Sequence, residues 1–263
     1  MENLRSFIER ANETKSVVAE LSTKIKNDVL KEMGNRILKY TKHIITENKK
    51  DVELAEDKGL SKALIDRLIL NEKRIKSMAE ALFYIAELPD PVGEIVWGTT
   101  RPNGLQIRQI RVPIGVIFII YESRPNVTVD AASLCFKAGN VSILRGGSES
   151  FNSNMALVNI MRDVLVSFKL PPNVISFIPT TAREAVKELL KYNDLIDLVI
   201  PRGGENLIRT VTEESKIPVV FHYKGVCHLF VDETAEKEMA EKIVINAKTQ
   251  RPGVCNAIES LLI

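Results

Sequence analysis

The sequence predicts an α/β fold in which a Rossmann-like parallel sheet with flanking helices follows an N-terminal helical block. Two observations support this prediction. From Gly115 onward, short apolar segments alternate with helical patterns, an order typical of parallel strands joined by right-handed crossovers. Before residue 89, apolar residues recur at helical spacing. The chain has 263 residues, of which 45% are apolar, so it is long enough to bury a sizeable core.

Residues 1–88 are the predicted helical segment, which we expect to pack on the α/β domain that follows. Apolar residues recur there every three or four positions, and Pro89 and Pro91 end the pattern. The clearest runs are Leu4, Phe7, Ile8 and Ala11, then Leu21, Ile25, Val29, Met33 and Ile37.

Residues 89–112 are predicted to form a strand hairpin. Residues 95–97 and 105–111 look like strands, and the Asn103-Gly104 pair between them is a strong hairpin signal. Gln106, Arg108 and Arg111 indicate a face exposed to solvent or to another subunit. The hairpin is therefore a candidate oligomerisation arm.

Residues 113–250 are predicted to form a nucleotide-binding α/β domain. The continuous apolar run at 116–120 is typical of a strand buried on both faces. The other predicted strands are 141–144, 174–178, 196–200, 219–221 and 227–231, and the predicted helices are 127–138, 151–168, 183–190, 205–214 and 235–248.

Composition excludes several classes of protein. The formal net charge of +2 is too small to indicate binding to nucleic acid or to an acidic membrane. The sequence has no apolar run long enough for a membrane-spanning helix and no signal-peptide pattern at its start. Its three cysteines and three histidines lack metal-ligand spacing, and an odd cysteine number fits a reducing cytoplasm. We expect a cytoplasmic protein without a metal.

Two predicted strands are followed by the same Arg-Gly-Gly sequence. Arg145-Gly146-Gly147 and Arg202-Gly203-Gly204 each follow an apolar strand and precede a helix. Glycines let the backbone approach a ligand closely, and a helix N-terminus favours an anion, so both segments are candidates for nucleotide binding. They are also compatible with two ordinary glycine turns. The Gly-x-Gly-x-x-Gly fingerprint is absent from the sequence.

Cys255 is the candidate nucleophile. Pro252 and Gly253 interrupt the helical pattern before it, and residues 256–259 are predicted to open a new helix. A thiol at a helix N-terminus is favoured as the thiolate. The alternative is an ordinary small, buried cysteine, and we expect that environment for Cys135 and Cys227.

Several motifs occur in one order along residues 93–259: 111–116 (RVPIGV), 121–128 (YESRPNVT), 137–140 (KAGN), 143–147 (ILRGG), 201–204 (PRGG), 225–228 (GVCH) and 249–256 (TQRPGVCN). With these motifs the chain resembles the γ-glutamyl phosphate reductases, or glutamate-5-semialdehyde dehydrogenases, a branch of the aldehyde dehydrogenase superfamily. The resemblance implies an aldehyde-dehydrogenase-like fold.

The resemblance also implies roles for individual residues. Cys255 matches the catalytic cysteine, and Asn126 is a candidate side-chain amide for the oxyanion, although a polar helix cap before Val127 explains it equally well. Arg145 occupies the place of a lysine that binds the cofactor's ribose or its phosphate, and arginine there favours NADPH. The other implied cofactor-binding residues are Gly146, Gly147, Gly203 and Gly204.

Residues 221–228 lack the glutamate that activates water in hydrolytic aldehyde dehydrogenases. An acyl-phosphate reductase gains from this loss, because water would destroy its thioester. His228 is either a substitute base or a structural strand residue.

The function implied by the resemblance is NADPH-dependent reduction of L-glutamyl 5-phosphate to L-glutamate 5-semialdehyde, with release of phosphate, in proline synthesis. A homo-oligomer and glutamate 5-kinase as a pathway partner are implied as well. The alternatives are a phosphate-independent aldehyde dehydrogenase and a non-catalytic nucleotide-binding or interaction fragment. Family members continue well beyond this cysteine, so residues 251–263 are expected to be the cysteine loop and the start of a truncated catalytic domain.

Overall fold

The computed structural model describes residues 4–122, 124–221, 225–252 and 254–263. The chain divides into two units, Met1–Val220 and Phe221–Ile263. The first unit contains the helical block, the hairpin and a four-stranded sheet, and the second contains the remaining strand pair with its helix. The functional boundaries predicted at residues 88, 112 and 250 stay predictions.

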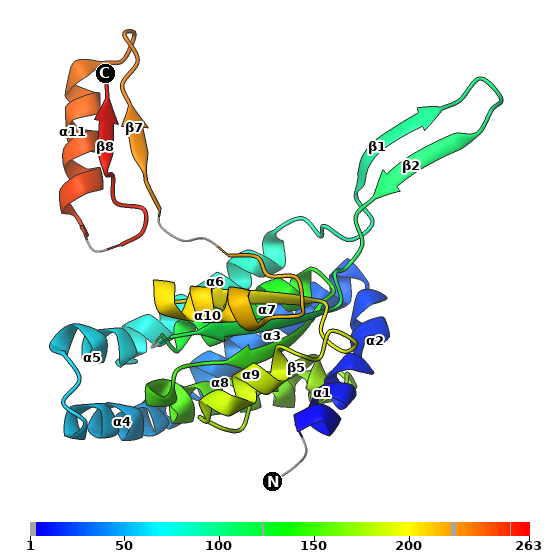
Figure 1. Cartoon of the computed structure of the whole chain (residues 1–263), viewed down its shortest axis with the longest axis horizontal. Coiled ribbons are helices and arrows are strands. Elements are labelled where there is room, and N and C mark those ends of the chain that lie inside the picture. The colour runs from blue at the N-terminus through cyan, green and yellow to red at the C-terminus, as the bar shows by residue number, and fades with distance from the viewer. Residues whose placement is uncertain (1–3, 123, 222–224, 253) are drawn as a thin grey trace. The chain divides into compact units, whose positions relative to one another are not determined.

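The predicted helical block is present in the first unit (Figure 1). Ser22 accepts a hydrogen bond from the N–H of Ile25, and Asn71 accepts one from the N–H of Arg74, so side chains satisfy the N-termini of the two long helices that follow them. The helices of the block are α1 (Leu4–Asn12), α2 (Lys15–Ala19), α3 (Thr23–Lys39), α4 (Thr41–Asp57), α5 (Lys62–Leu68) and α6 (Glu72–Glu87).

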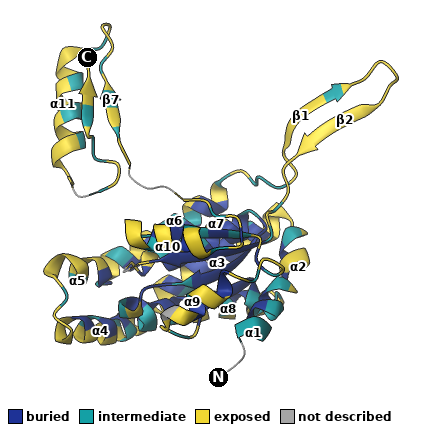
Figure 2. Ribbon diagram, viewed as in Figure 1, coloured by how far each residue is buried: buried dark blue, intermediate teal, exposed yellow. Residues whose placement is uncertain are grey.

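The four-stranded sheet of the first unit is wholly parallel, in the order β5-β4-β3-β6. Its central strand β3 (Val116–Tyr121) is buried along its whole length, as its apolar run predicts. Figure 2 shows this buried centre between the helices of the unit. The other strands are β4 (Val141–Arg145), β5 (Ile175–Phe177) and β6 (Leu198–Arg202), and the helices are α7 (Asn126–Lys137), α8 (Phe151–Ser167), α9 (Arg183–Leu189) and α10 (Glu205–Glu214).

The sheet's register brings three strand ends together. Ile120 pairs with Arg145 on β4, and Tyr121 pairs with Arg202 on β6. Both Arg-Gly-Gly segments therefore lie at one edge of the sheet, on either side of the residue that follows β3. The predicted strand at 219–221 is wrong, since in that segment only Val219 makes a bridge, to Val199.

The predicted hairpin is confirmed as β1 (Ile95–Thr100) paired antiparallel with β2 (Gln106–Ile110). Gly104 adopts a φ of +84° in the turn, a conformation that glycine adopts without strain. Almost every residue of the two strands is exposed (Figure 2).

The second unit is a β-α-β element. Strand β7 (His228–Phe230) pairs in parallel with β8 (Ser260–Leu262), and α11 (Lys237–Thr249) connects them. The predicted helix at 256–259 is wrong, because the N–H groups of Glu259 and Ser260 donate to the carbonyl of Cys227 and lead the chain into β8. Within the described ranges, no helix combines the length and apolar character needed to cross a membrane.

Candidate functional site

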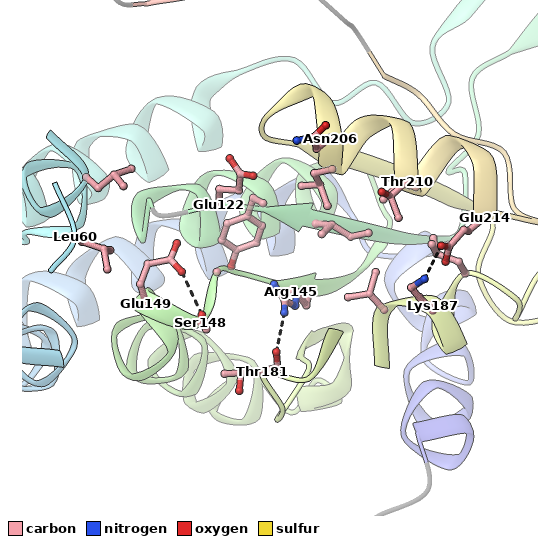
Figure 3. Close-up of a pocket in the computed structure, with 18 residues that line it drawn as sticks. Leu60, Glu122, Arg145, Ser148, Glu149, Thr181, Lys187, Asn206, Thr210 and Glu214 are labelled. Carbon is pink, nitrogen blue, oxygen red and sulfur yellow. Dashed lines mark hydrogen bonds and ion pairs between the residues drawn. The ribbon is translucent and has the colours of Figure 1, made fainter. Parts of the chain in front are cut away.

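A cavity of about 820 Å³ opens at the carboxyl edge of the sheet in the first unit. Figure 3 shows its lining residues, from Leu60 to the ion pair between Lys187 and Glu214. The cavity lies where open α/β sheets bind their ligands, outside the carboxyl ends of parallel strands. The ends of β3 and β4 and the residues that follow them supply part of its wall: Ile120, Tyr121, Glu122, Arg145, Gly147, Ser148 and Glu149.

One part of this cavity is apolar. Val186 and Leu190 from the α9 segment face the cavity together with Leu207 and Val211 from α10. Thr210 also lines this part of the cavity. An ion pair joins the two helices, with 2.7 Å between Nζ of Lys187 and Oε1 of Glu214. The aliphatic side chains make the part of the wall formed by α9 and α10 largely apolar.

Arg145 lies in the polar part of the cavity wall. It is the last residue of β4, it is half-buried, and its Nη2 donates a hydrogen bond of 3.0 Å to the carbonyl of Thr181 (Figure 3). This contact ties the guanidinium to the loop before α9. The structure thus places Arg145 at the cavity, as a cofactor-binding role requires.

Gly146 is required by packing. A Cβ at this position would overlap the amide nitrogen of Asn154 and lie 3.1 Å from Cε2 of Tyr121. Asn154 accepts from the Thr128 hydroxyl at 2.8 Å, and the hydroxyls of Thr128 and Tyr121 lie 2.6 Å apart. Burial raises the pKa of Tyr121, so this network is neutral. At Gly147 a Cβ would instead overlap the carboxylate of Glu149, which also lines the cavity.

Gly203 and Gly204 lie against a carboxylate that sequence reasoning missed. The N–H of Gly204 donates a hydrogen bond of 3.1 Å to Oε2 of Glu122, and a Cβ on Gly203 would lie 2.6 Å from the Cδ of that side chain. Glu122 directly follows the buried strand β3. The sequence did carry a signal for Glu122, because this residue directly follows an apolar strand and belongs to the motif at 121–128.

Asn126 is the first residue of α7 and is exposed. Its Nδ2 donates a hydrogen bond of 3.0 Å to Asp130, whose pKa is raised by burial and lowered in part by this bond. The alternative of a helix cap before Val127 is wrong, because the residue before α7 is Pro125 and no side chain caps it. Asn126 is not among the cavity's lining residues, and its oxyanion role stays a prediction.

Cys255 belongs to the second unit and is exposed. The residues described after it form turns and then β8, so the helix N-terminus expected to favour its thiolate is absent from that segment. Gly253, part of the predicted break, lies outside the described residues. The nucleophile assignment stays a prediction that rests on the motif.

The other two cysteines differ from each other. Cys135 is buried on α7, as expected, and burial raises the pKa of its thiol to about 12. Cys227 is half-buried and not a core thiol, so that expectation is wrong. It precedes β7, a short strand with exposed neighbours, which leaves its sulfur close to the surface.

His228 is the first residue of β7, which confirms the strand interpretation of its backbone. Its side chain is exposed and its Nδ1 lies 3.0 Å from the carbonyl of Val226. His222, Tyr223 and Lys224 of the segment that lacks the glutamate lie outside the described residues. Among the residues that the structure covers, no group of three or more histidine, cysteine or carboxylate side chains is placed to hold a metal ion.

Comparison with known proteins agrees with the resemblance. The model of the aldehyde dehydrogenase family matches residues 2–263. The gamma-glutamyl phosphate reductase of Citrifermentans bemidjiense is 53% identical over 262 residues, which cover 100% of this chain and 63% of that protein. That of a Sulfurihydrogenibium strain is 55% identical over 258 residues, which cover 98% and 58%.

The chain is also similar to a solved structure. The crystal structure of gamma-glutamyl phosphate reductase from Thermotoga maritima superposes with a TM-score of 0.92 at 43% identity, over 99% of this chain and 63% of that one. This chain thus spans less than two thirds of the length of these relatives. The predicted fold class is confirmed, and the chain belongs to the aldehyde dehydrogenase family.

Proposed function

We propose that this chain carries the cofactor site and the nucleophile of an NADPH-dependent reductase that converts L-glutamyl 5-phosphate to L-glutamate 5-semialdehyde and phosphate. The observation that carries the proposal is the cavity at the sheet's carboxyl edge, with Arg145 in its wall, in a chain whose relatives at 52–55% identity are named gamma-glutamyl phosphate reductase. The reaction would belong to proline synthesis in the cytoplasm, with glutamate 5-kinase as the pathway partner.

The residues at the cavity fit the nicotinamide cofactor that the family implies. A volume of about 820 Å³ is within the range of sites for ligands of this size. The apolar wall formed by Val186, Leu190 and Leu207 suits the adenine ring. The first turn of α10 offers N–H groups to an anion. Arg145 is the basis for preferring NADPH, since its guanidinium can bind a 2′-phosphate with two donors.

The chemistry would begin at Cys255. Its thiolate attacks the acyl carbon, the new C–S bond forms, and phosphate leaves with the electron pair of the broken C–O bond. Backbone N–H groups, with Asn126, would hold the oxyanion. When bound, the reduced nicotinamide supplies the hydride that converts the thioester to the thiohemiacetal, whose collapse returns the thiolate and releases the aldehyde. The lack of glutamate at 221–228 protects the thioester from water.

The test is the reverse reaction, reduction of NADP⁺ by glutamate 5-semialdehyde, with and without phosphate or arsenate. We expect this chain to show almost no turnover, and what turnover it has should depend on phosphate and be lost with Cys255→Ser. Both proteins should bind NADPH with the same affinity in a fluorescence titration. Turnover without phosphate would indicate an ordinary aldehyde dehydrogenase. Failure of the chain to bind NADPH would overturn the proposal.

We further propose that the hairpin mediates homo-oligomer formation. Ile95, Trp97, Ile107 and Ile110 are between 41% and 53% exposed, on a two-stranded ribbon whose outer edges carry unpaired backbone groups. Analytical ultracentrifugation of Trp97→Glu tests this, with Tyr84→Glu as a control because Tyr84 is an exposed aromatic residue of α6. A loss of association with Trp97→Glu alone is expected, and equal association of both variants would contradict it.

A further inference from the structure

A carboxylate of the protein itself, that of Glu122, lies at the N-terminus of α10. Oε2 of Glu122 accepts a hydrogen bond of 3.1 Å from the N–H of Gly204, the residue that precedes α10. A Cβ on Gly203 would lie 2.6–2.9 Å from the atoms of the same carboxylate. The carboxylate therefore fills the space beside the Cα of Gly203 and accepts from the N–H of Gly204.

Glu122 also faces the cavity. It lines the same wall as Arg145 and Ser148, and Figure 3 shows it beside the first turn of α10, where Asn206 is labelled. The carboxylate reaches this place from the end of β3, the strand next to β6, because Tyr121 and Arg202 are paired. The register between β3 and β6 thus determines where the Glu122 carboxylate lies.

A dinucleotide bound in this cavity needs hydrogen-bond donors for its anionic phosphates, as the Glu122 carboxylate does. Its pyrophosphate carries two negative charges, and the N–H groups at the start of α10 are the anion-binding groups of the Gly203-Gly204 turn. Two anions at one helix N-terminus repel each other at close range. The cofactor's phosphates and the Glu122 carboxylate therefore compete for one position.

We propose that Glu122 is an internal substitute for the cofactor's pyrophosphate, which holds the α10 N-terminus and is displaced when the dinucleotide binds. This inference rests on the proposed function. Glu122 then sets the affinity for the cofactor, because part of the binding free energy is spent on breaking its contact with Gly204. An exchange of this kind favours release of the dinucleotide after each reaction, since the carboxylate can return.

The experiment compares Glu122→Gln with the unchanged chain. The amide keeps the size of the side chain and removes the charge that competes with phosphate. We expect Glu122→Gln to bind NADPH at least about threefold more tightly in a fluorescence titration, and inorganic pyrophosphate more tightly in calorimetry. Affinity for 2′-AMP, which lacks the pyrophosphate, should stay the same.

A matched control is Glu205→Gln. Glu205 lies in the first turn of α10 and does not line the cavity, so this variant makes the same charge change next to the same helix end. Its affinities should change clearly less than those of Glu122→Gln, because Glu205 is not among the residues that line the cavity. Circular dichroism of each variant verifies that it is folded.

The other possible results overturn either this inference or the proposed function. Unchanged or weaker binding of NADPH and pyrophosphate by Glu122→Gln overturns the inference, and weaker binding would mean that the carboxylate contacts the ligand directly. An equal gain with Glu205→Gln also overturns it, because the effect would then be a general one of charge. If neither protein binds NADPH, the proposed function fails, and the pyrophosphate measurement still decides the role of Glu122.

Discussion

The thiol of Cys227 donates a hydrogen bond to the backbone carbonyl of Cys255, with 3.2 Å between Sγ and O. The same carbonyl lies 2.9 Å from the position of a Cβ on Gly225, so the segment before β7 and the candidate nucleophile's loop are in close contact. The carbonyl of Cys227 in turn accepts from the N–H groups of Glu259 and Ser260. Cys227 therefore contacts the loop at Cys255 itself and at the end of the loop that leads into β8.

The three cysteines should differ in reactivity. We expect iodoacetamide at pH 7–9 to label Cys255 first, since it is exposed, then the half-buried Cys227. Cys135 should remain unlabelled in the folded chain, because it is buried and its pKa is raised to about 12. Peptide mass spectrometry over a time course gives the order, and labelling in urea controls for intrinsic reactivity. Labelling of Cys135 before Cys255 under native conditions would contradict the nucleophile assignment.

Arg145→Ala should reduce the preference for NADPH over NADH. Loss of a charge-assisted contact costs on the order of 1.5–3 kcal/mol, so the ratio of the two affinities should fall roughly 10- to 150-fold. Titration of each cofactor against the variant measures the ratio. Lys187→Ala is the control, since Lys187 is a second cation of the same cavity and is paired with Glu214. A ratio that survives Arg145→Ala would exclude Arg145 as the group that recognises the 2′-phosphate.

Gly146→Ala should destabilise the first unit more than Gly204→Ala. The new methyl group overlaps the buried Asn154 amide, and overpacking of this kind costs about 1–3 kcal/mol. At Gly204 the nearest atom is 3.9 Å from the added Cβ, and the change at this N-cap should cost less than about 1 kcal/mol. Urea unfolding followed by far-UV circular dichroism compares the two. Equal stabilities would show that Gly146 is not required by packing.

Asp90→Asn should lower the free energy of unfolding at pH 7 by about 3–5 kcal/mol, because it leaves the fully buried Lys26 ammonium without its carboxylate, 2.9 Å away. Asp66→Asn is the control: its pair with Arg74 is exposed, and its loss should cost less than about 1 kcal/mol. Similar losses in the two variants would contradict the stabilising role of the buried pair.

The same pair predicts a pH dependence. Burial alone raises the pKa of Asp90, and hydrogen bonds from Lys26, Val92 N–H and Thr23 outweigh it, so the pKa is lowered. A lowered carboxyl pKa adds stability above the unfolded value of about 3.9, and this contribution is lost as pH falls through the folded value. Unfolding measured between pH 7 and 2 should therefore show a shallower acid limb in Asp90→Asn. An unchanged acid limb would argue against ionised Asp90 in the folded chain.

Local pattern was enough to predict most elements. The buried strand β3, the hairpin around Asn103-Gly104 and the helices before residue 89 are all present, because burial on both faces, turn conformation and helical periodicity each leave a signal within a few residues. The same signals located Arg145 at a strand end, and the register of β3 and β4 puts it at the cavity.

Contacts between residues that are distant in sequence determine the features that local pattern did not predict. Residues 256–259 carry a helix-start signal, yet the carbonyl of Cys227, about 30 residues earlier in the chain, binds Glu259 N and Ser260 N and leads the segment into a strand. Glu122 faces the Gly203-Gly204 turn only because β3 and β6 are neighbours in the sheet, and Gly146 must be glycine only because α8 brings Asn154 against it. Such contacts join residues that are distant in sequence, so tertiary structure alone determines them.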